Sequence, residues 1–283
     1  MRPNWPRLVI VLVAAAALVS GLVWGAAVIW STVTKQPLPM DSQCRATASG
    51  ASVTLTPEQA VNATIITSVA LTRGLPARAV TIALTTAYQE SGIRNLDYGD
   101  RDSVGLFQQR PSQGWGSEKQ LMDPYYASNK FYDALAKIKN WQTRDLTEVA
   151  QAVQVSGHPE AYRDHEADAK VLASTLTGHS PGGFSCLDRT GADGDAKGLS
   201  AALVKTFGAD AKATRDGAVL TVTADSAEHA WAYGTFAVAN SAQYGTLQVV
   251  VHDQQWDTNS MTLPSWVKAD SVLKAKQVKI TVR

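Results

Sequence analysis

The chain has 283 residues, a formal net charge of +1, 45% hydrophobic residues and 18% charged residues. This length corresponds to about two domains of roughly 150 residues each, and the composition excludes a wholly disordered chain. The near-neutral charge argues against a nucleic-acid partner, and two cysteines are too few for a zinc ribbon or a disulfide-dense scaffold.

The first element along the chain is an uncharged apolar run over residues 8–30. About 20 such residues span a bilayer, so the run predicts a transmembrane helix. Arg2 and Arg7 precede it, which places residues 1–7 in the cytoplasm and the rest of a single-pass protein outside the cell membrane. A cleaved signal peptide is the alternative, but its apolar region would be shorter, about 7–15 residues, and followed by a small-residue cleavage site.

Composition divides the remaining chain into two linkers and two domains. Residues 31–53 are rich in Ser, Thr, Pro and Gln, and residues 178–197 are rich in Gly, Pro and Asp, as is typical of linkers. Residues 54–177 have a helical pattern, whereas residues 198–283 mix short helices with the β-branched runs 218–224, 246–252 and 277–283. The expected fold class is therefore a mainly α domain plus a small α+β C-terminal domain, behind one N-terminal transmembrane helix.

The two cysteines, Cys44 and Cys186, bracket the helical region. Disulfides persist outside the cell membrane, so we expect a Cys44–Cys186 bridge. Two unpaired thiols are the alternative.

Two helices are predicted from their start and stop signals. Thr56 is an expected N-cap with Pro57 in the first helical position, and Gly74 ends that helix. Pro76 begins the next helix, which Gly92 ends.

Glu90 lies near the end of this second helix, on its core-facing side. Ala79, Ala83 and Ala87 recur every four residues, and Glu90 comes three positions later. Burial disfavours the charged carboxylate, and the negative end of the helix dipole does so too. A carboxyl that keeps its proton near neutral pH has the properties of a general acid.

A second motif lies downstream of this acid. Glu90-Ser91, with Gly105-Leu106-Phe107-Gln108-Gln109 after it, resembles the Glu-Ser and Gly-Leu-x-Gln pair of the lysozyme-like superfamily, which includes lytic transglycosylases and goose-type lysozymes. The resemblance implies a lysozyme-like fold for residues 54–177 and peptidoglycan as the partner. It also implies cleavage of the MurNAc–GlcNAc β-1,4 bond with Glu90 as acid/base, and contacts to the substrate or the acid from Gln108.

The resemblance leaves the position of a second carboxyl open. Gly99-Asp100-Arg101 is similar to a Gly-Asp-Arg of goose-type enzymes, which implies that Asp100 orients water, with Asp102 as a substitute. Inverting hydrolysis needs such a carboxyl at roughly 6.5–9.5 Å from the acid. Lytic transglycosylases do without it, because the muramoyl 6-hydroxyl attacks its own anomeric carbon. Transglycosylase-type cleavage is the favoured interpretation.

A departure from the superfamily pattern lies on a later helix. Lytic transglycosylases usually carry an Ala-Tyr-Asn-Ala-Gly-like motif there, whereas residues 152–157 of this chain have no Tyr-Asn, and Tyr162 is the candidate replacement. A catalytically inactive wall-binding or scaffold protein is therefore the alternative function.

Further substrate contacts are expected from Ser91, Gln109, Tyr98 and Trp115, the two aromatic residues because rings stack on sugar faces. The histidines and acids match no zinc or EF-hand spacing, so we expect no metal and no cofactor. The C-terminal domain shows no nucleophile motif, which leaves binding to wall polymer or to an envelope protein as its expected role.

Overall fold

A computed structural model describes residues 21, 24–25, 41–154 and 159–283. The chain divides into two compact units, residues 1–40 and 41–283. The predicted transmembrane segment, residues 8–30, lies outside the described residues except at positions 21, 24 and 25. Each helix within the described ranges is too short or too polar to cross a bilayer.

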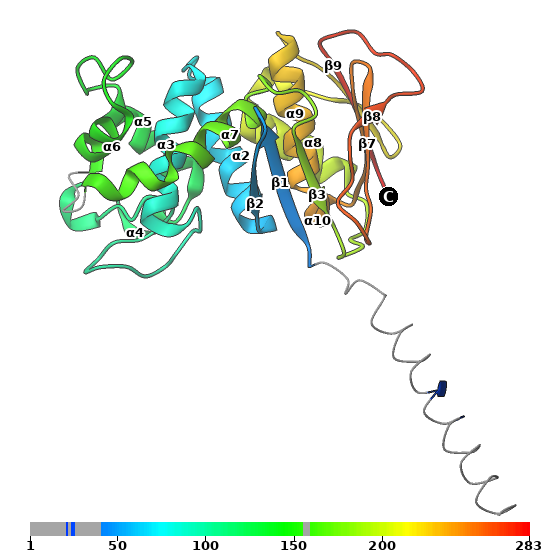
Figure 1. Ribbon diagram of the computed structural model, residues 1–283. Helices are drawn as coiled ribbons and strands as arrows, with labels where there is room; N and C mark the ends of the chain where they lie inside the picture. Colours follow the sequence, from blue (N-terminus) through cyan, green and yellow to red (C-terminus); the bar gives the residue numbers. More distant parts are fainter. Residues whose placement is uncertain (1–20, 22–23, 26–40, 155–158) are drawn as a thin grey trace, which may run out of the picture. The chain divides into compact units, whose positions relative to one another are not determined.

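Nine α-helices and two antiparallel sheets make up the described part of the second unit, residues 41–283 (Figure 1). The helices are α2 (Pro57–Thr72), α3 (Ala77–Ser91), α4 (Glu118–Leu121), α5 (Pro124–Leu135), α6 (Leu146–Gln154), α7 (Glu166–Leu176), α8 (Ala196–Phe207), α9 (Ala227–Ala239) and α10 (Ser241–Tyr244), with 3-10 turns η1 (Pro111–Gln113), η2 (Pro159–His165) and η3 (Ala209–Ala211).

The smaller sheet has the strand order β2-β1-β3 and the larger sheet the order β4-β5-β9-β6-β7-β8. The strands are β1 (Gln43–Ala48), β2 (Ala51–Leu55), β3 (Phe184–Leu187), β4 (Thr214–Asp216), β5 (Val219–Thr223), β6 (Thr246–Val251), β7 (Gln254–Asp257), β8 (Val267–Lys268) and β9 (Gln277–Val282).

The predicted ends of the first two helices are confirmed. Thr56 caps α2 by accepting a hydrogen bond from the Gln59 backbone N–H, while the Gln59 side chain accepts one from the Thr56 N–H. Gly92 ends α3 in the left-handed conformation at φ 63°. The predicted β-branched runs form β5, β6 and β9.

The predicted fold class is wrong, because α2 joins the two parts that were expected to be separate domains. Residues 60 and 62–70 of α2 are all buried, so almost every face of the helix is covered. Helices α3 and α5 pack on it from the helical part, and α8 and α9 pack on it from the C-terminal part. Residues 41–283 are consequently one compact unit.

Strands occupy the two stretches that were predicted as linkers. β1 and β2 lie within residues 31–53 except for the last two residues of β2, and β3 lies within residues 178–197. Side chains of β1 alternate between exposed and buried, as expected for a strand with one face on a core. β3 pairs with β1 in antiparallel register, and Cys44 and Cys186 are directly opposite each other in the predicted disulfide.

β3 also connects the smaller sheet to the C-terminal part. The indole N–H of Trp256 donates to the Ser185 hydroxyl at 2.9 Å, and that of Trp266 donates to the Phe184 carbonyl at 2.7 Å. α9 covers the larger sheet at β6 and β9, and a Cβ on Gly234 would lie 2.7 Å from Val251, so glycine allows this close packing.

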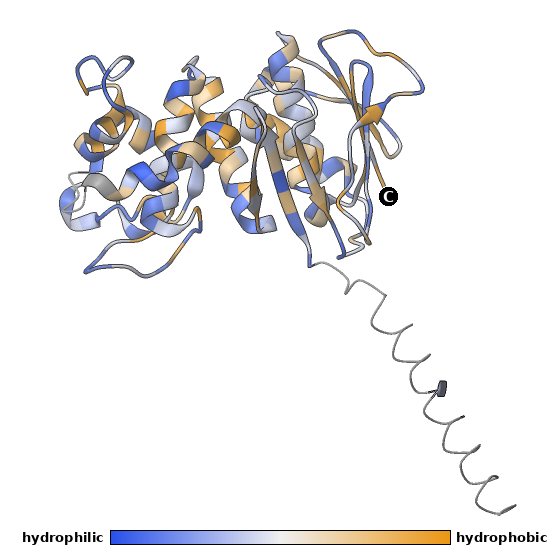
Figure 2. Cartoon of the chain, viewed as in Figure 1, coloured by the Kyte–Doolittle hydropathy of each residue, from blue (hydrophilic) through white to orange (hydrophobic). Residues whose placement is uncertain are grey.

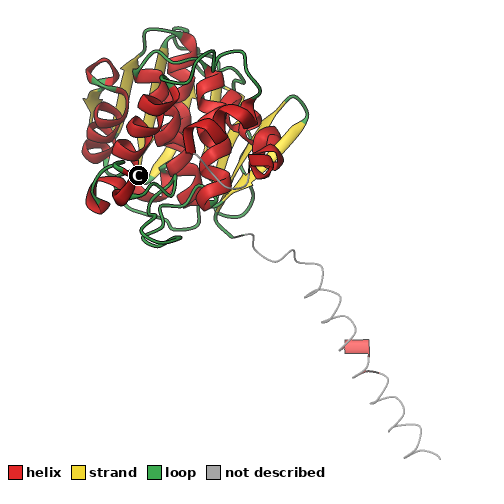
Figure 3. Cartoon of the chain, turned by 90° about the vertical axis from the view of Figure 1, so that its left-hand side faces the viewer, coloured by secondary structure: helices red, strands yellow, loops and turns green. Residues whose placement is uncertain are grey.

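The colouring by hydropathy shows apolar residues on helices and strands inside the unit and polar residues on the outer loops (Figure 2). Seen from its helical end, the unit presents helices to the viewer with the strands behind them (Figure 3).

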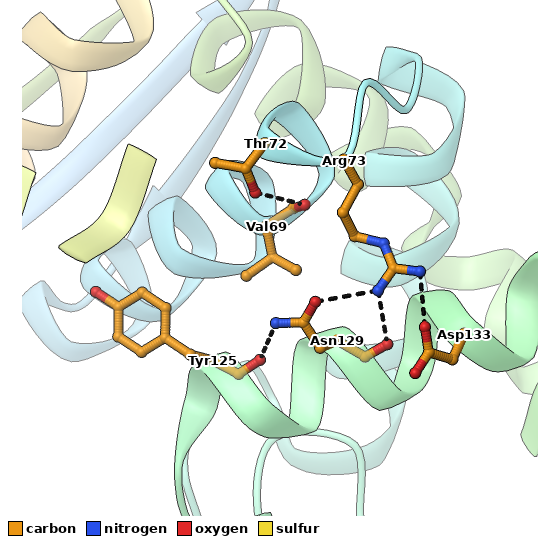
Figure 4. A network of polar contacts seen from close by, with 6 residues as sticks. All are labelled: Val69, Thr72, Arg73, Tyr125, Asn129 and Asp133. Carbon is orange, nitrogen blue, oxygen red and sulfur yellow. Dashed lines mark hydrogen bonds and ion pairs between the residues drawn. The ribbon is translucent and has the colours of Figure 1, made fainter. Parts of the chain in front are cut away.

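Polar contacts at the end of α2 fix α5 (Figure 4). The Arg73 guanidinium donates to the Asn129 side-chain oxygen at 3.0 Å and to Asp133 at 2.7 Å. These exposed contacts add to the direct packing of α5 on α2.

Candidate active site

Glu90 lies in the last turn of α3 and is half-buried. The Tyr162 hydroxyl donates to Glu90 Oε1 at 2.5 Å. Burial raises the pKa of Glu90 above its usual value, although the polar side chains of Tyr162 and Gln154 oppose this by stabilising the carboxylate. The carboxyl group therefore binds its proton more tightly than usual, and these two side chains stabilise the negative charge that remains when the proton leaves.

Tyr162 reaches Glu90 from η2, and its side chain is completely buried. The end of that segment is fixed on α3. The His165 ring stacks on Tyr88 with 4.9 Å between centroids, and His165 Nε2 lies 3.1 Å from the Gln89 side-chain oxygen. Three consecutive residues of α3 thus position Tyr162 and receive its hydrogen bond.

A cavity of about 440 Å³ shares Gln154 with the surroundings of this acid, although Glu90 itself is not among the described residues of the cavity lining. Gln154 lines the cavity, lowers the pKa of Glu90 and donates to the Phe107 carbonyl at 2.7 Å. The described residues of its lining are Gln108, Gln109, Arg110, Gln113, Trp115 and Gln154.

The Gly-Leu-x-Gln turn is fixed to the acid-bearing helix by Ser91. The buried Ser91 hydroxyl donates to the Leu106 carbonyl at 2.7 Å and lies 3.0 Å from the Ala87 carbonyl. Gly105 adopts φ +80°, and a Cβ there would approach the Leu121 carbonyl oxygen to 2.5 Å. The Ser91 hydroxyl, for which a substrate contact was predicted, is thus buried and bonded to protein, and Ser91 is a structural tie between the turn and α3.

Gln108, Gln109 and Trp115, which were predicted to contact substrate, line the cavity. The Gln108 amide donates to the Tyr98 carbonyl at 3.2 Å. The Gln109 amide donates to the Ala127 carbonyl at 3.4 Å, and its side-chain oxygen is buried with no partner among the described residues. An unsatisfied buried oxygen in a cavity wall is suited to accept a hydrogen bond from a ligand.

The predicted second carboxyl is not among the described residues of this wall. The Asp100 side chain is 91% exposed and lies 3.9 Å from the Arg101 guanidinium. Asp102 accepts from the Ser112 N–H and the Arg110 guanidinium, both at 2.7 Å, and these bonds hold the pKa of Asp102 well below its usual range. Tyr98 is 67% exposed and is likewise absent from the described lining.

Gln154 is the functional candidate that sequence reasoning missed. Gln154 is the last residue of α6 and lies in residues 152–157, where only the missing Tyr-Asn was noted from the sequence. The sequence gives little reason to assign a function to Gln154, because a polar residue at a helix end is ordinarily solvated. Only the packing of α6 against α3 places its amide beside Glu90.

The cavity wall offers amides, a guanidinium and an indole, and the acid beside it is a carboxyl. Within the described ranges, no three His, Cys, Asp or Glu side chains are grouped so that they could hold a metal ion. Neither a protein-family model nor a curated protein matches this chain. The geometry of the Glu90 site is therefore the basis for assigning a function.

Proposed function

We propose that this chain is a murein glycosidase that cleaves the MurNAc–GlcNAc β-1,4 bond of peptidoglycan, with Glu90 as general acid and base. The observation that carries the proposal is the half-buried Glu90 carboxyl group, whose pKa is raised, which accepts a hydrogen bond from Tyr162, and whose neighbour Gln154 lines a cavity. The amides and Arg110 in the cavity wall suit sugar hydroxyl and acetamido groups, and Trp115 suits a pyranose face. The resemblance of the Glu-Ser and Gly-Leu-x-Gln pair to the lysozyme-like superfamily supports the same reaction.

The reaction needs one carboxyl group acting twice. Glu90 first donates its proton to the glycosidic oxygen, which leaves with the departing GlcNAc as a hydroxyl. The 6-hydroxyl of the muramoyl residue then attacks its own anomeric carbon, and the Glu90 carboxylate accepts the hydroxyl proton. The products are a 1,6-anhydro end and a protonated Glu90. Between the steps, Tyr162 and Gln154 stabilise the carboxylate.

Two observations favour this transglycosylase route over hydrolysis. Asp100 is exposed, and Asp102 is bonded to Arg110 and Ser112. A water-activating carboxyl would have to face the substrate from the side opposite the acid.

The apolar run over residues 8–30 supports a membrane anchor with the catalytic unit outside the cell. An anchored enzyme of this kind would act on the wall that surrounds the membrane. An envelope protein that binds the C-terminal part is a further proposal from the sequence.

The test measures soluble muropeptides released from insoluble peptidoglycan by the wild-type chain and by Glu90→Gln. Removal of the acid should lower the rate at least about 100-fold, because general acid catalysis contributes on that scale. Glu118→Gln is the matched control, because Glu118 is exposed at the start of α4 and should leave the rate unchanged.

Mass spectrometry of the products distinguishes the routes, because only the transglycosylase leaves 1,6-anhydro ends. Equal release by wild type and Glu90→Gln would overturn the assignment. Sedimentation of both proteins with peptidoglycan, without release by either, would instead identify a wall-binding protein.

A further inference from the structure

The cavity of about 440 Å³ has three glutamines in its described lining, Gln108, Gln109 and Gln154. A glutamine amide can donate through its nitrogen or accept through its oxygen, so its orientation decides what it offers to a ligand. A backbone carbonyl only accepts hydrogen bonds, so the side-chain atom that bonds one is the amide nitrogen. Contacts of this kind fix the orientation of all three side chains.

The amide nitrogen of Gln108 is fully used by the protein. Gln108 Nε2 donates to the Tyr98 carbonyl at 3.2 Å and to the Gly105 carbonyl at 3.3 Å. A primary amide has two N–H groups, so Gln108 has none left for a ligand and offers only its oxygen as an acceptor.

Gln109 and Gln154 also turn their nitrogens toward the protein, and their oxygens are buried without a partner. Gln109 Nε2 donates to the Ala127 carbonyl at 3.4 Å. Gln154 Nε2 donates to the Phe107 carbonyl at 2.7 Å. Gln109 is only 2% exposed, and neither its Oε1 nor that of Gln154 accepts a hydrogen bond from a described residue. Buried polar atoms are almost always satisfied, so two such acceptors in one cavity wall point to a ligand that donates two hydrogen bonds.

Charge in the wall distinguishes between candidate ligands. Arg110 is the cation among the described lining residues, and it is already paired, because Nε donates to Asp102 at 2.7 Å and Nη2 to the Ser112 hydroxyl at 3.2 Å. A carboxylate can only accept, so it would leave both glutamine oxygens unsatisfied and bring a negative charge beside them. A primary carboxamide has the same planar shape and supplies two N–H donors. Its own oxygen can accept from the N–H groups that Arg110 retains.

The position of the cavity indicates which part of a glycan it meets. Glu90 is not among its described lining residues, whereas the reacting sugar has to touch Glu90. The cavity therefore receives a group that lies beyond the reacting atoms, such as a branch of the polymer. In peptidoglycan the branches are stem peptides, whose carboxyl groups occur free or as carboxamides. The acetamido group of a sugar has one N–H and would satisfy only one of the two oxygens.

We propose that this cavity binds a primary carboxamide of the stem peptide, with Gln109 and Gln154 accepting from its two N–H groups, and discriminates against the corresponding carboxylate. The choice of polymer rests on the proposed function, but the preference for an amide rests on the wall alone. Gln109 is then a specificity-determining residue, which selects amidated peptidoglycan and takes no part in the cleavage step.

The probes are two muramoyl dipeptides that differ in one group. N-acetylmuramoyl-L-alanyl-D-isoglutamine carries a carboxamide where N-acetylmuramoyl-L-alanyl-D-glutamate carries a carboxylate, and N-acetylglucosamine supplies an acetamido group without a peptide. Each is titrated into the full-length chain and followed by saturation-transfer NMR. The isoglutamine probe should bind at least about tenfold more tightly than either of the others, because buried acceptors left unpaired cost about that factor. None of the probes contains the bond that the proposed enzyme cleaves, so a failed cleavage assay and a failed binding assay are distinct results.

Substitutions in the wall and one control locate the contact. Gln109→Met removes the amide and keeps the length of the side chain, so it should reduce the preference for the isoglutamine probe several-fold; near-UV circular dichroism verifies that this buried variant folds. Gln142→Met makes the same change at an exposed position and should bind as wild type does. Gln113→Lys changes an exposed residue of the wall, and its unpaired cation should raise the affinity for the glutamate probe several-fold.

Equal affinity for the two dipeptides would overturn the proposal, and so would an undiminished preference in a folded Gln109→Met or an unchanged affinity of Gln113→Lys for the glutamate probe. Binding of N-acetylglucosamine as tight as that of the isoglutamine probe would also overturn it, because the cavity would then take the acetamido group of a sugar.

Discussion

The hydrogen bond between Tyr162 and Glu90 predicts how the pKa of Glu90 changes when Tyr162 is replaced, whatever the substrate is. Replacing Tyr162 by Phe removes the hydroxyl that donates to Glu90 Oε1 at 2.5 Å and keeps the completely buried ring. Because that bond stabilises the carboxylate, its loss should make Glu90 hold its proton still more tightly. The pKa of Glu90 should therefore rise further in Tyr162→Phe.

The magnitude comes from the type of bond. A hydrogen bond to a charged group contributes about 1.5–3 kcal/mol, which corresponds to a fall of about 10-fold to 100-fold in the proton dissociation constant of the carboxyl group. Glu90 is half-buried, so water replaces part of the lost bond and the lower end of this range is expected.

The assay is an NMR titration of the Glu90 carboxyl carbon, which is assigned as the signal that disappears in Glu90→Gln. Tyr98→Phe is the control, because Tyr98 is 67% exposed and should leave the titration unchanged. An unchanged titration in Tyr162→Phe, or a shift to lower pH, would refute the role given to the hydroxyl. In an active enzyme, the alkaline limb of the pH–rate profile should move to higher pH by the same amount.

Stability should respond to three further changes. Ser91→Ala should lower the free energy of unfolding by about 1–3 kcal/mol in a urea titration, because the Leu106 carbonyl loses its buried donor. Ser112→Ala, at an exposed position, is the control. An equal loss of stability in Ser112→Ala would contradict the structural role given to the Ser91–Leu106 hydrogen bond. Glu90→Gln should melt at a higher temperature than wild type at pH 7 and at the same temperature as wild type at pH 4. The reason is that folding raises the pKa of Glu90, so the wild-type protein loses stability as the pH rises above 4.5, the ordinary carboxyl pKa. A difference of the same size at both pH values would show that ionisation is not its cause. Reduction of the Cys44–Cys186 disulfide should lower the free energy of unfolding by about 2–5 kcal/mol. Because β3 contacts both sheets, residues 41–283 should still unfold in one transition when tryptophan fluorescence is followed against urea. Separate transitions for the two parts would contradict the shared core.

The sequence by itself determined the features that depend on neighbours within a few residues. Thr56 with Pro57, and Gly92 after the alanine series, marked the start of α2 and the end of α3, because capping is local backbone chemistry. The same helical period placed Glu90 toward the interior. The β-branched runs indicated β5, β6 and β9, since such side chains favour extended backbone.

The hairpin of β1 and β2 has a turn that the local sequence could have predicted, although the composition of the stretch is typical of a linker. Ser49 and Gly50 form a two-residue turn with φ of 50° and 80°, which is the geometry favoured between antiparallel strands. The many small polar residues of β1 and β2 nevertheless made the stretch look like a linker, because strands with one solvated face alternate rather than cluster their apolar residues.

Only the tertiary structure decided the rest, since those features depend on residues far apart in the chain. The pairing of β1 with β3 joins positions separated by 142 residues, and the burial of α2 needs helices from both parts of the chain. The partners of Glu90 are of the same kind: Tyr162 and Gln154 come from η2 and α6, each more than sixty residues away. A single sequence shows which residues could serve as acid or donor, but their distances depend on how helices and strands pack, which no local pattern encodes.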